Sequence, residues 1–147
     1  MRCRETVAGL HRERIKEEER SMIRRFLLAG SFDPFTIGHA DLVQRALTLC
    51  DELVIGVGFN ERKTGWIPVD ERVRALRQLY AGVPGVRVEK YSCLTVDFAR
   101  QAGIDCLLRG VRNMADCDYE MQMAEVNRQL AGLETVMLPS SPQLAHV

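Results

Sequence analysis

A glycine-bounded turn that ends in a histidine is the part of this sequence best suited to chemistry on phosphate. Residues 29–47, AGSFDPFTIGHADLVQRAL, leave an apolar run, turn through Gly30 and Pro34, and resume helical periodicity after His39. The N-terminus of a helix offers unpaired backbone N–H groups and a partial positive charge, which together bind phosphate. Gly30 and Gly38 remove Cβ atoms where a polyphosphate would approach. Pro34 stiffens the turn and His39 adds a nitrogen donor, so the stretch predicts an anion site that stabilises charge developing on phosphate.

Two other phosphate motifs do not fit the sequence. The dinucleotide pattern G-x-G-x-x-G is absent, and GFNERKT, residues 58–64, lacks the glycine that precedes the lysine of a P-loop. A histidine in the first turn of a helix is more often a surface or capping residue than a catalyst. The residues alone therefore predict an anion site and leave the role of His39 open.

An arginine at the expected end of a buried strand is the second candidate. A guanidinium such as that of Arg109 is costly to bury unless an anion meets it. The alternative is a structural arginine that pairs with Asp97, Asp105 or Asp116. We favour anion binding and keep the ion pair as the alternative.

A helix expected at 114–130 carries acidic and apolar groups at helical spacing. Asp116 and Glu120 lie one turn apart and share a face, which suits either a site or a solvated acidic stripe. An apolar stripe at the same spacing predicts core or a subunit interface; it consists of Tyr119, Met123, Val126 and Leu130. By itself, Lys63 in the polar loop 58–68 is expected to be a solvated lysine.

Short apolar runs alternate with amphipathic segments, which is typical of βαβ units that build a parallel sheet. We expect strands at 25–29, 52–58, 86–91, 104–108 and 134–138. We expect helices at 40–50, 70–80, 94–101 and 114–130. Short connections and right-handed crossovers then favour an α/β fold, a Rossmann-like doubly wound sheet of five parallel strands in a single domain, with its ligand crevice at the carboxyl ends of the strands.

The composition limits the class of protein. The 147 residues suffice for one domain, and 46% hydrophobic with 27% charged residues is the balance of a globular protein. Twenty basic and twenty acidic residues cancel, which argues against a nucleic-acid binder. Residues 1–21 carry six Lys/Arg and five Asp/Glu with little to bury, so we expect them to lie outside the fold, and 22–147 to form the domain.

Cysteines and hydropathy suggest the cytoplasm. The five cysteines are an odd number without a C-x-x-C pair, and we interpret them as reduced and mostly buried. No apolar run approaches the ~20 residues that span a bilayer, and the start lacks the apolar core of a secretory signal. We therefore expect no membrane association.

Several motifs, in order, resemble those of the nucleotidyltransferases, and more narrowly the bacterial phosphopantetheine adenylyltransferases of coenzyme A biosynthesis. The first motif of that family stands here as Gly30-Ser31-Phe32-Asp33-Pro34 followed by Thr36-Ile37-Gly38-His39, with Thr36 where cytidylyltransferases carry a histidine. Further matches are Lys63, SCLTVDFAR at 92–100, Arg109-Gly110-Val111-Arg112, the acidic segment 116–120 and MAEVNRQLAGLET at 123–135. The resemblance covers residues 23–147.

The resemblance implies adenylyl transfer from ATP to 4′-phosphopantetheine, giving dephospho-coenzyme A and pyrophosphate by direct in-line attack. Mg²⁺ is expected as the counterion of ATP, without protein ligands, and coenzyme A is a further expected ligand. The resemblance also implies a homo-oligomer, in the usual case a hexamer.

The resemblance also assigns roles. In the family pattern Ser31 and Phe32 hold the nucleotide and the acceptor phosphate, and His39 donates to the α-phosphate. Lys63 closes onto phosphate, Thr95 lies at the pantetheine position, and Arg109 binds the acceptor's phosphate. The nucleotide side is lined by Gly110, Val111 and Arg112, with Glu120 on the adenosine. The expected catalytic residues are His39, Lys63 and Arg112.

Two departures from the family pattern matter. Ala29 replaces the usual proline before the first motif. The family continues with a serine-rich motif that binds the phosphates of ATP, whereas this chain stops at SSPQLAHV, where that motif should begin. We therefore expect a domain truncated at its C-terminus and hypothesise that this 147-residue form binds ATP poorly.

Two rival functions stay open beside this reading. One is another small-molecule nucleotidyltransferase, such as a nicotinamide mononucleotide adenylyltransferase or a glycerol-phosphate cytidylyltransferase. The other is a nucleotide- or coenzyme A-binding module that is inactive through loss of the C-terminal motif.

Overall fold

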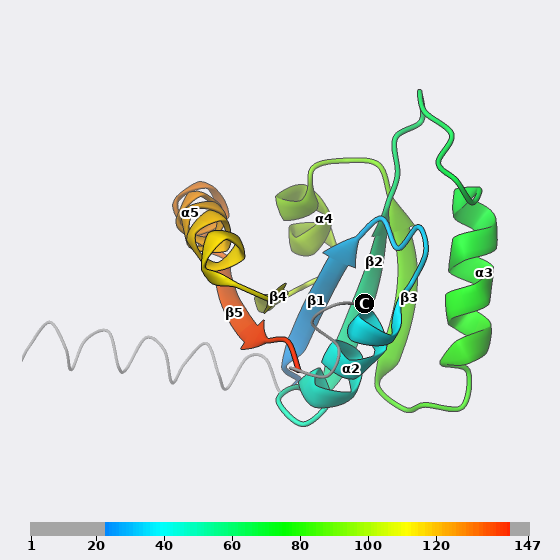
Figure 1. Cartoon of the computed structure of the whole chain (residues 1–147), viewed down its shortest axis with the longest axis horizontal. Helices are drawn as coiled ribbons and strands as arrows, with labels where there is room; N and C mark the ends of the chain where they lie inside the picture. The colour runs from blue at the N-terminus through cyan, green and yellow to red at the C-terminus, as the bar shows by residue number, and fades with distance from the viewer. Residues whose placement is uncertain (1–22, 142–147) are drawn as a thin grey trace, which may run out of the picture.

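The computed structural model describes residues 23–141 (Figure 1). The expectations for residues 1–21 and for the C-terminal end fall outside this range. In chain order the elements are β1 (Arg25–Gly30), α2 (Ile37–Ala46), β2 (Glu52–Gly58), α3 (Val69–Leu79), β3 (Val86–Tyr91), α4 (Thr95–Gln101), β4 (Cys106–Val111), α5 (Met114–Ala131) and β5 (Glu134–Pro139). The alternation of strands and helices confirms the order predicted from periodicity.

The five strands form one parallel sheet in the order β3-β2-β1-β4-β5. Leu27 in the central strand is paired with Val54 of β2 on one side and with Leu107 of β4 on the other. The chain builds outward from β1 to β3 and then returns to place β4 on the other side of β1. Because ligands of doubly wound sheets bind where the strand order reverses, the crevice is expected at the carboxyl ends of β1 and β4. The predicted α/β, Rossmann-like single domain is confirmed.

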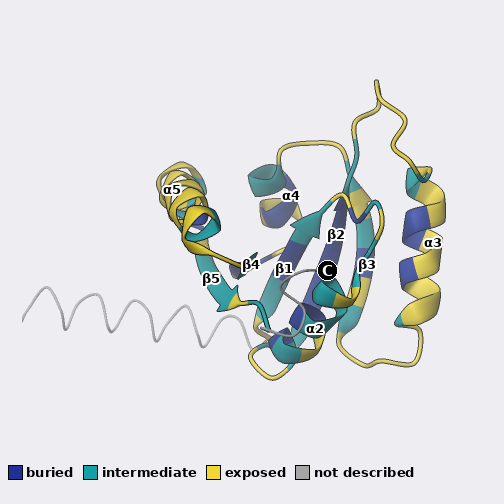
Figure 2. Ribbon diagram, viewed as in Figure 1, coloured by how far each residue is buried: buried dark blue, intermediate teal, exposed yellow. Residues whose placement is uncertain are grey.

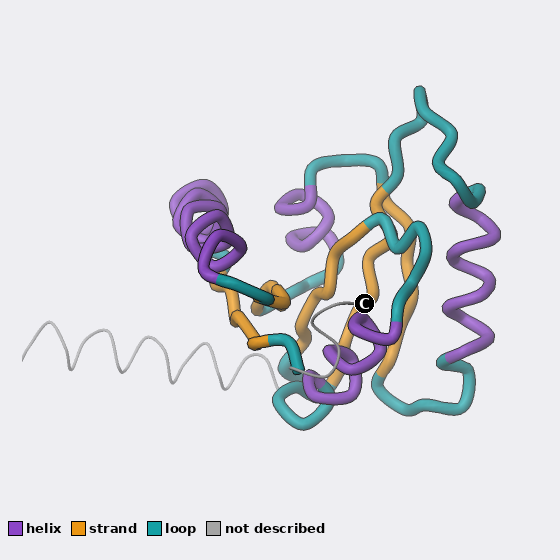
Figure 3. Tube along the Cα trace, in the orientation of Figure 1, coloured by secondary structure: helices purple, strands orange, loops and turns teal. Residues whose placement is uncertain are grey.

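Helices cover both faces of the sheet, and each face has its own apolar core. On one face Val43 and Ala46 of α2 and Val73 of α3 pack against sheet residues such as Ile55. On the other face Phe98 of α4 packs against strands β1, β2 and β4. In Figure 2 the buried residues concentrate in the central strands, as a sheet covered on both sides requires. The loops after β1 and β2 leave from the same edge (Figure 3).

The fourth strand begins two residues later than predicted. Asp105 binds the start of β1 in both directions, because its N–H donates to the Arg25 carbonyl and its carboxylate accepts from the Arg25 N–H at 2.8 Å. The Ile104 N–H meanwhile closes the turn after α4 by donating to Ala99. The ladder therefore starts at Cys106, and the strand runs on through Val111.

The first helix begins earlier and ends sooner than the expected 40–50. It begins at Ile37 because Thr36 caps it. It ends at Ala46, since the N–H groups of Leu49 and Cys50 both donate to the Ala46 carbonyl, which tightens the last turn. Local capping sets both bounds.

The prediction that the cysteines are mostly buried is wrong for the described residues. Cys106 is buried, Cys50 and Cys117 are half-buried, Cys93 is exposed, and all four are free thiols. Over residues 23–141, none of the helices combines the length and apolar character that crossing a bilayer requires.

Candidate active site

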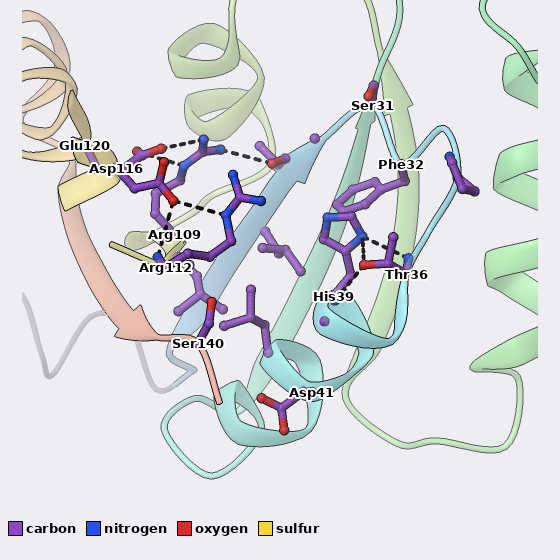
Figure 4. Close-up of a pocket in the computed structure, with 18 of the residues that line it drawn as sticks. Ser31, Phe32, Thr36, His39, Asp41, Arg109, Arg112, Asp116, Glu120 and Ser140 are labelled. Carbon is purple, nitrogen blue, oxygen red and sulfur yellow. Dashed lines mark hydrogen bonds and ion pairs between the residues drawn. The ribbon is translucent and has the colours of Figure 1, made fainter. Parts of the chain in front are cut away.

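A cavity of about 490 Å³ opens at the carboxyl ends of β1 and β4 (Figure 4). Ser31, His39 and Arg109, from three different segments, all line it. The structure brings seven of the predicted site residues to this cavity: Ser31, Phe32, His39, Arg109, Gly110, Arg112 and Glu120. The crevice therefore lies where the strand order places it.

The loop after β1 presents its backbone to the cavity while burying its aromatic ring. Phe32 has a left-handed backbone with φ of 50° and is 4% exposed. A Cβ on Gly30 would lie 3.2 Å from the Phe32 ring, so the glycine makes room for it. Because the ring is packed in the core, Phe32 can contact a ligand chiefly through its main chain.

The proton position on His39 follows from the cap of α2. The backbone N–H of Thr36 donates to His39 Nδ1 at 3.0 Å, and the Thr36 hydroxyl in turn accepts from the His39 N–H at 3.3 Å. A backbone N–H can only donate, so Nδ1 is an acceptor and the ring proton lies on Nε2. Histidine here takes the place that Glu or Gln fills in an ordinary capping box.

Burial also keeps this imidazole neutral. The ring of Phe32 lies edge-on to it with centroids 5.0 Å apart, and that of Phe35 is 5.3 Å away. Desolvation lowers the pKa of His39 below its ordinary 6.5. At neutral pH His39 is therefore an uncharged donor through Nε2–H, and it is both the capping residue and a residue of the cavity wall.

Arg109 is held in a bidentate ion pair with Glu120. Its Nε donates to Oε2 at 2.9 Å and its Nη2 to Oε1 at 2.8 Å, while Nη1 donates to the Ala29 carbonyl at 3.2 Å. The hydrogen bonds to Glu120 raise the pKa of Arg109 above its ordinary value. The partner is thus neither Asp97, Asp105 nor Asp116. Three of five N–H groups are used, and the other two, one on each terminal nitrogen, can meet an anion.

A second cavity of about 340 Å³ adjoins the first. Six residues line both cavities and so form the wall between them: Ala29, Gly30, Ser31, Leu108, Arg109 and Glu120. Thr95 lies in the second cavity, where its hydroxyl is 2.9 Å from that of Tyr91. The buried hydroxyl of Thr135, which lines the second cavity only, has no hydrogen-bond partner among the described residues.

Two of the predicted site residues line neither cavity, and a third lines the first cavity but is exposed. Lys63 is exposed on the loop 58–68 and lines neither of the two cavities. Val111 also lies outside both and pairs with Pro139 in the sheet. Arg112 reaches the first cavity but is exposed, and its Nε donates to Asp116 at 3.1 Å.

Gly110 has a packing role in addition to its place in the cavity wall. A Cβ there would come 2.7 Å from Leu42 of α2. The glycine therefore leaves room for the Leu42 side chain between α2 and β4.

Sequence reasoning missed a link between the segment after β5 and α2. The Ser141 hydroxyl donates to Asp41 at 2.9 Å, and Arg45 donates to both Asp41 and the Pro139 carbonyl. Asp41 and Ser141 line the first cavity. These partners are about a hundred residues apart in sequence, so no local pattern could have shown the link.

Within the described range, 23–141, no group of three or more His, Cys, Asp or Glu side chains is placed to hold a metal ion. The carboxylates of the first cavity are already engaged: Glu120 by Arg109, Asp116 by Arg112, Asp41 by Arg45, and Asp33 by the backbone N–H groups of Trp66 and Ile67. A divalent ion would therefore have to take most of its ligands from phosphate oxygens and water, which is the usual habit of Mg²⁺.

The sequence of this chain is similar to those of known proteins. Residues 27–145 match the family model described as cytidylyltransferase-like. The chain is 48% identical over 125 residues to a phosphopantetheine adenylyltransferase of Bacteroides fragilis, covering 85% of this chain and 83% of that one. It is 43% identical over 121 residues to the protein of the same name from Cutibacterium acnes, covering 82% and 77%.

Solved structures extend the likeness of the fold. A lipopolysaccharide core biosynthesis protein from Thermoplasma volcanium superposes with a TM-score of 0.60 over 81% of this chain and 97% of that one, at 18% identity. At such identity the likeness concerns the fold alone. The sequence matches are much closer, and by them this chain belongs to the cytidylyltransferase-like family and, within it, to the phosphopantetheine adenylyltransferases.

Proposed function

We propose that this protein transfers the adenylyl group of ATP to 4′-phosphopantetheine, giving dephospho-coenzyme A and pyrophosphate. A phosphate oxygen of the acceptor attacks the α-phosphorus, and the bond from that phosphorus to the bridging oxygen of pyrophosphate breaks. No covalent enzyme intermediate is needed, so the protein acts by positioning the reactants and stabilising charge.

One observation carries this proposal: two cavities share a wall, and Gly30, Ser31 and Arg109 are among the residues that line it. A reaction between two bound phosphorylated molecules needs adjoining sites with donors at their junction. The backbone of the loop after β1 and the two remaining N–H groups of Arg109 supply such donors. We assign the first cavity to the nucleotide and the second, with Thr95, to the pantetheine arm.

The neutral His39 suits the α-phosphate. Its Nε2–H is a donor that needs no proton transfer, and it is held by Thr36 before substrate arrives. Preorganised donors of this kind stabilise the charge that builds on phosphate oxygens in the transition state. We assign Lys63 and Arg112 to phosphate binding from the rim, and Glu120 both to holding Arg109 and to the adenosine side.

We further propose Mg²⁺ as the counterion that ATP brings with it. The ion neutralises charge on clustered phosphates, and the engaged carboxylates of the cavity leave its coordination largely to the substrate. Coenzyme A, which shares the pantetheine arm, is a proposed further ligand of the second cavity, and the cytoplasm is the proposed location.

An acceptor panel tests the function. Pyrophosphate release is measured with three substrate pairs: ATP with 4′-phosphopantetheine, ATP with nicotinamide mononucleotide, and CTP with glycerol phosphate. We expect release with the first pair alone. Release with another pair and none with the first would reject the proposal, as would tight binding of both substrates without turnover.

Helix α5 supports the proposed homo-oligomer. Glu120 is its one residue buried within the described chain, whereas Tyr119, Val126 and Leu130 are 59%, 44% and 69% exposed. The apolar stripe is thus not core, and we propose it as a subunit interface, in a hexamer by family resemblance. Light scattering after size exclusion tests this: Leu130→Glu should reduce the mass of the native assembly, and a monomeric wild type would refute it.

A further inference from the structure

The loop after β2 is tied at its base to the loop after β1. The carboxylate of Asp33 accepts the backbone N–H of Trp66 at 2.8 Å through Oδ2 and that of Ile67 at 2.9 Å through Oδ1. Both bonds are to the main chain, and the Trp66 ring itself is 92% exposed. Asp33 therefore fixes where this segment of backbone lies, regardless of the side chains it carries.

A buried arginine closes the link from the other side. Arg72 in α3 is 7% exposed, its Nε donates to the Ile67 carbonyl at 2.8 Å, and its Nη1 donates to the Ser31 carbonyl. Over residues 23–141, no carboxylate forms an ion pair with it. Burying a guanidinium that is bound only to two carbonyls has a high desolvation cost. Because these carbonyls belong to different loops, this cost points to a need for a fixed position of one loop relative to the other.

The segment between these two side chains has no spare room. A Cβ on Gly65 would overlap Asp33 Oδ2 and lie 3.4 Å from Arg72 Nη2. We call Asp33, Gly65, Trp66, Ile67 and Arg72 the loop clamp. Its hydrogen bonds form a closed ring. Asp33 accepts from the Ile67 N–H, Arg72 donates to the Ile67 carbonyl and also to that of Ser31, and Ser31 lies in the same loop as Asp33.

We propose that Asp33 and Arg72 are positioning residues for adenylyl transfer, which set the place of Lys63 relative to the phosphate-binding loop. This rests on the proposed function and deepens it. Lys63 precedes Trp66 by three residues, so a closed clamp keeps the Lys63 Cα within about 10 Å of the clamped backbone. The clamp thereby limits how far the exposed Lys63 can move from the loop after β1.

Limited proteolysis tests the clamp without any need for activity. Trypsin cleaves after Arg62 and Lys63, and local opening of a loop sets the rate. We expect Asp33→Asn and Arg72→Gln to raise the cleavage rate at these sites about tenfold, as the loss of charge-assisted hydrogen bonds implies. Cleavage after Lys90, inside β3, reports global unfolding and should not rise in parallel.

Matched controls come from the same fold. Asp105→Asn removes a carboxylate that also accepts a backbone N–H at 2.8 Å, but at the opposite end of β1. Arg77→Gln removes an arginine of α3 that also donates twice to a backbone carbonyl, that of Val88. Neither should change cleavage after Lys63. Equal acceleration in controls and clamp variants would overturn the proposal.

A double-mutant cycle with Lys63 tests the link to catalysis. We expect Asp33→Asn to lower kcat about tenfold with little change in KM, and to change kcat by less than about twofold when Lys63 is already Ala. A purely structural role would give the same factor in both backgrounds and would overturn the inference. If Lys63→Ala alone leaves kcat unchanged, the proposed role of Lys63 fails, while the proteolysis result still decides whether the clamp exists.

Gly65→Ala is the variant of choice if Arg72→Gln does not fold. It leaves both charged residues in place and forces the Asp33 carboxylate away from the amides it accepts. We expect faster cleavage after Lys63 and the same dependence on Lys63 in the cycle. Wild-type cleavage and kcat in this variant would contradict the clamp.

Discussion

The two sides of the first cavity are built by different means. On the side of α2, the bonds that fix His39 come from Thr36, three residues away. On the side of β4, Arg109 is fixed by Glu120, eleven residues on, and by Ala29, eighty residues back. The first side depends on the conformation of one short segment, whereas the second exists only after the sheet and α5 have assembled. Substitutions on the first side should therefore change kcat more than the free energy of unfolding. Substitutions on the second side should change the free energy of unfolding more than kcat.

The largest expected effect is on the local side. His39→Ala removes the Nε2–H donor, and we expect kcat to fall by roughly 10² to 10³, the usual loss for one preorganised donor. Steady-state kinetics of adenylyl transfer measures this.

The control is His39→Gln, because glutamine also fills this position of a capping box and should preserve the helix. A native-like unfolding curve with reduced kcat in the Gln variant separates catalysis from capping. An unchanged kcat in the Ala variant would remove His39 from the mechanism.

The second prediction concerns the assembled side. Glu120→Gln leaves Arg109 without its counter-charge, and we expect the free energy of unfolding to fall by about 1–3 kcal/mol. The loss stays below that of a fully buried pair because the Arg109 side chain is 38% exposed. Urea denaturation measures it.

Glu125→Gln is the matched control for this change. Glu125 lies in the same helix and pairs with Arg128, but both side chains are about half exposed. Its replacement should leave the urea denaturation curve nearly unchanged, because solvent screens an exposed ion pair. Equal losses in the two variants would mean that the ion pair of Arg109 contributes no more than a surface pair.

The same contrast explains what could be predicted from the sequence. The order of strands and helices along the chain and the site at the end of β1 follow from periodicity and local turn chemistry, and both were predicted. The partner of Arg109 was not, because pairing across a helix depends on where α5 packs. The start of β4 was placed too early, since the bonds between Asp105 and Arg25 join residues eighty apart. The hydrogen bond from Arg72 to Ser31 was not predicted for the same reason, since the two residues are 41 apart in sequence.

The third prediction is a smaller effect on the local side. Thr36→Ala removes the side-chain cap of α2 and should lower the free energy of unfolding by about 1 kcal/mol. The backbone N–H that donates to His39 Nδ1 remains, so kcat should fall by less than about tenfold. Thr36→Ser keeps the hydroxyl and should restore both quantities; failure of Ser to do so would mean that the methyl group, not the cap, matters.

The smallest expected effect is a pH dependence that isolates His39. Its pKa in the folded protein lies below the ordinary 6.5 because the ring is desolvated among Phe32 and Phe35. As the pH falls below 6.5, the unfolded chain therefore takes up the proton before the folded one does, and stability is lost until the pH reaches the lowered value. Above 6.5 the contribution is fully present and flat.

In the difference in unfolding free energy between wild type and His39→Asn, the contributions of the other titrating groups cancel, including those of His11 and His146. Urea curves from about pH 5 to pH 8 should show this difference shrinking on the acid side alone. Because Nδ1 is bound to an N–H in the folded state, the imidazolium form must also break that bond, which adds to the same sign. A difference that grows toward acid would mean that His39 carries charge in the folded protein, and the neutral donor on which the local side depends would have to be abandoned.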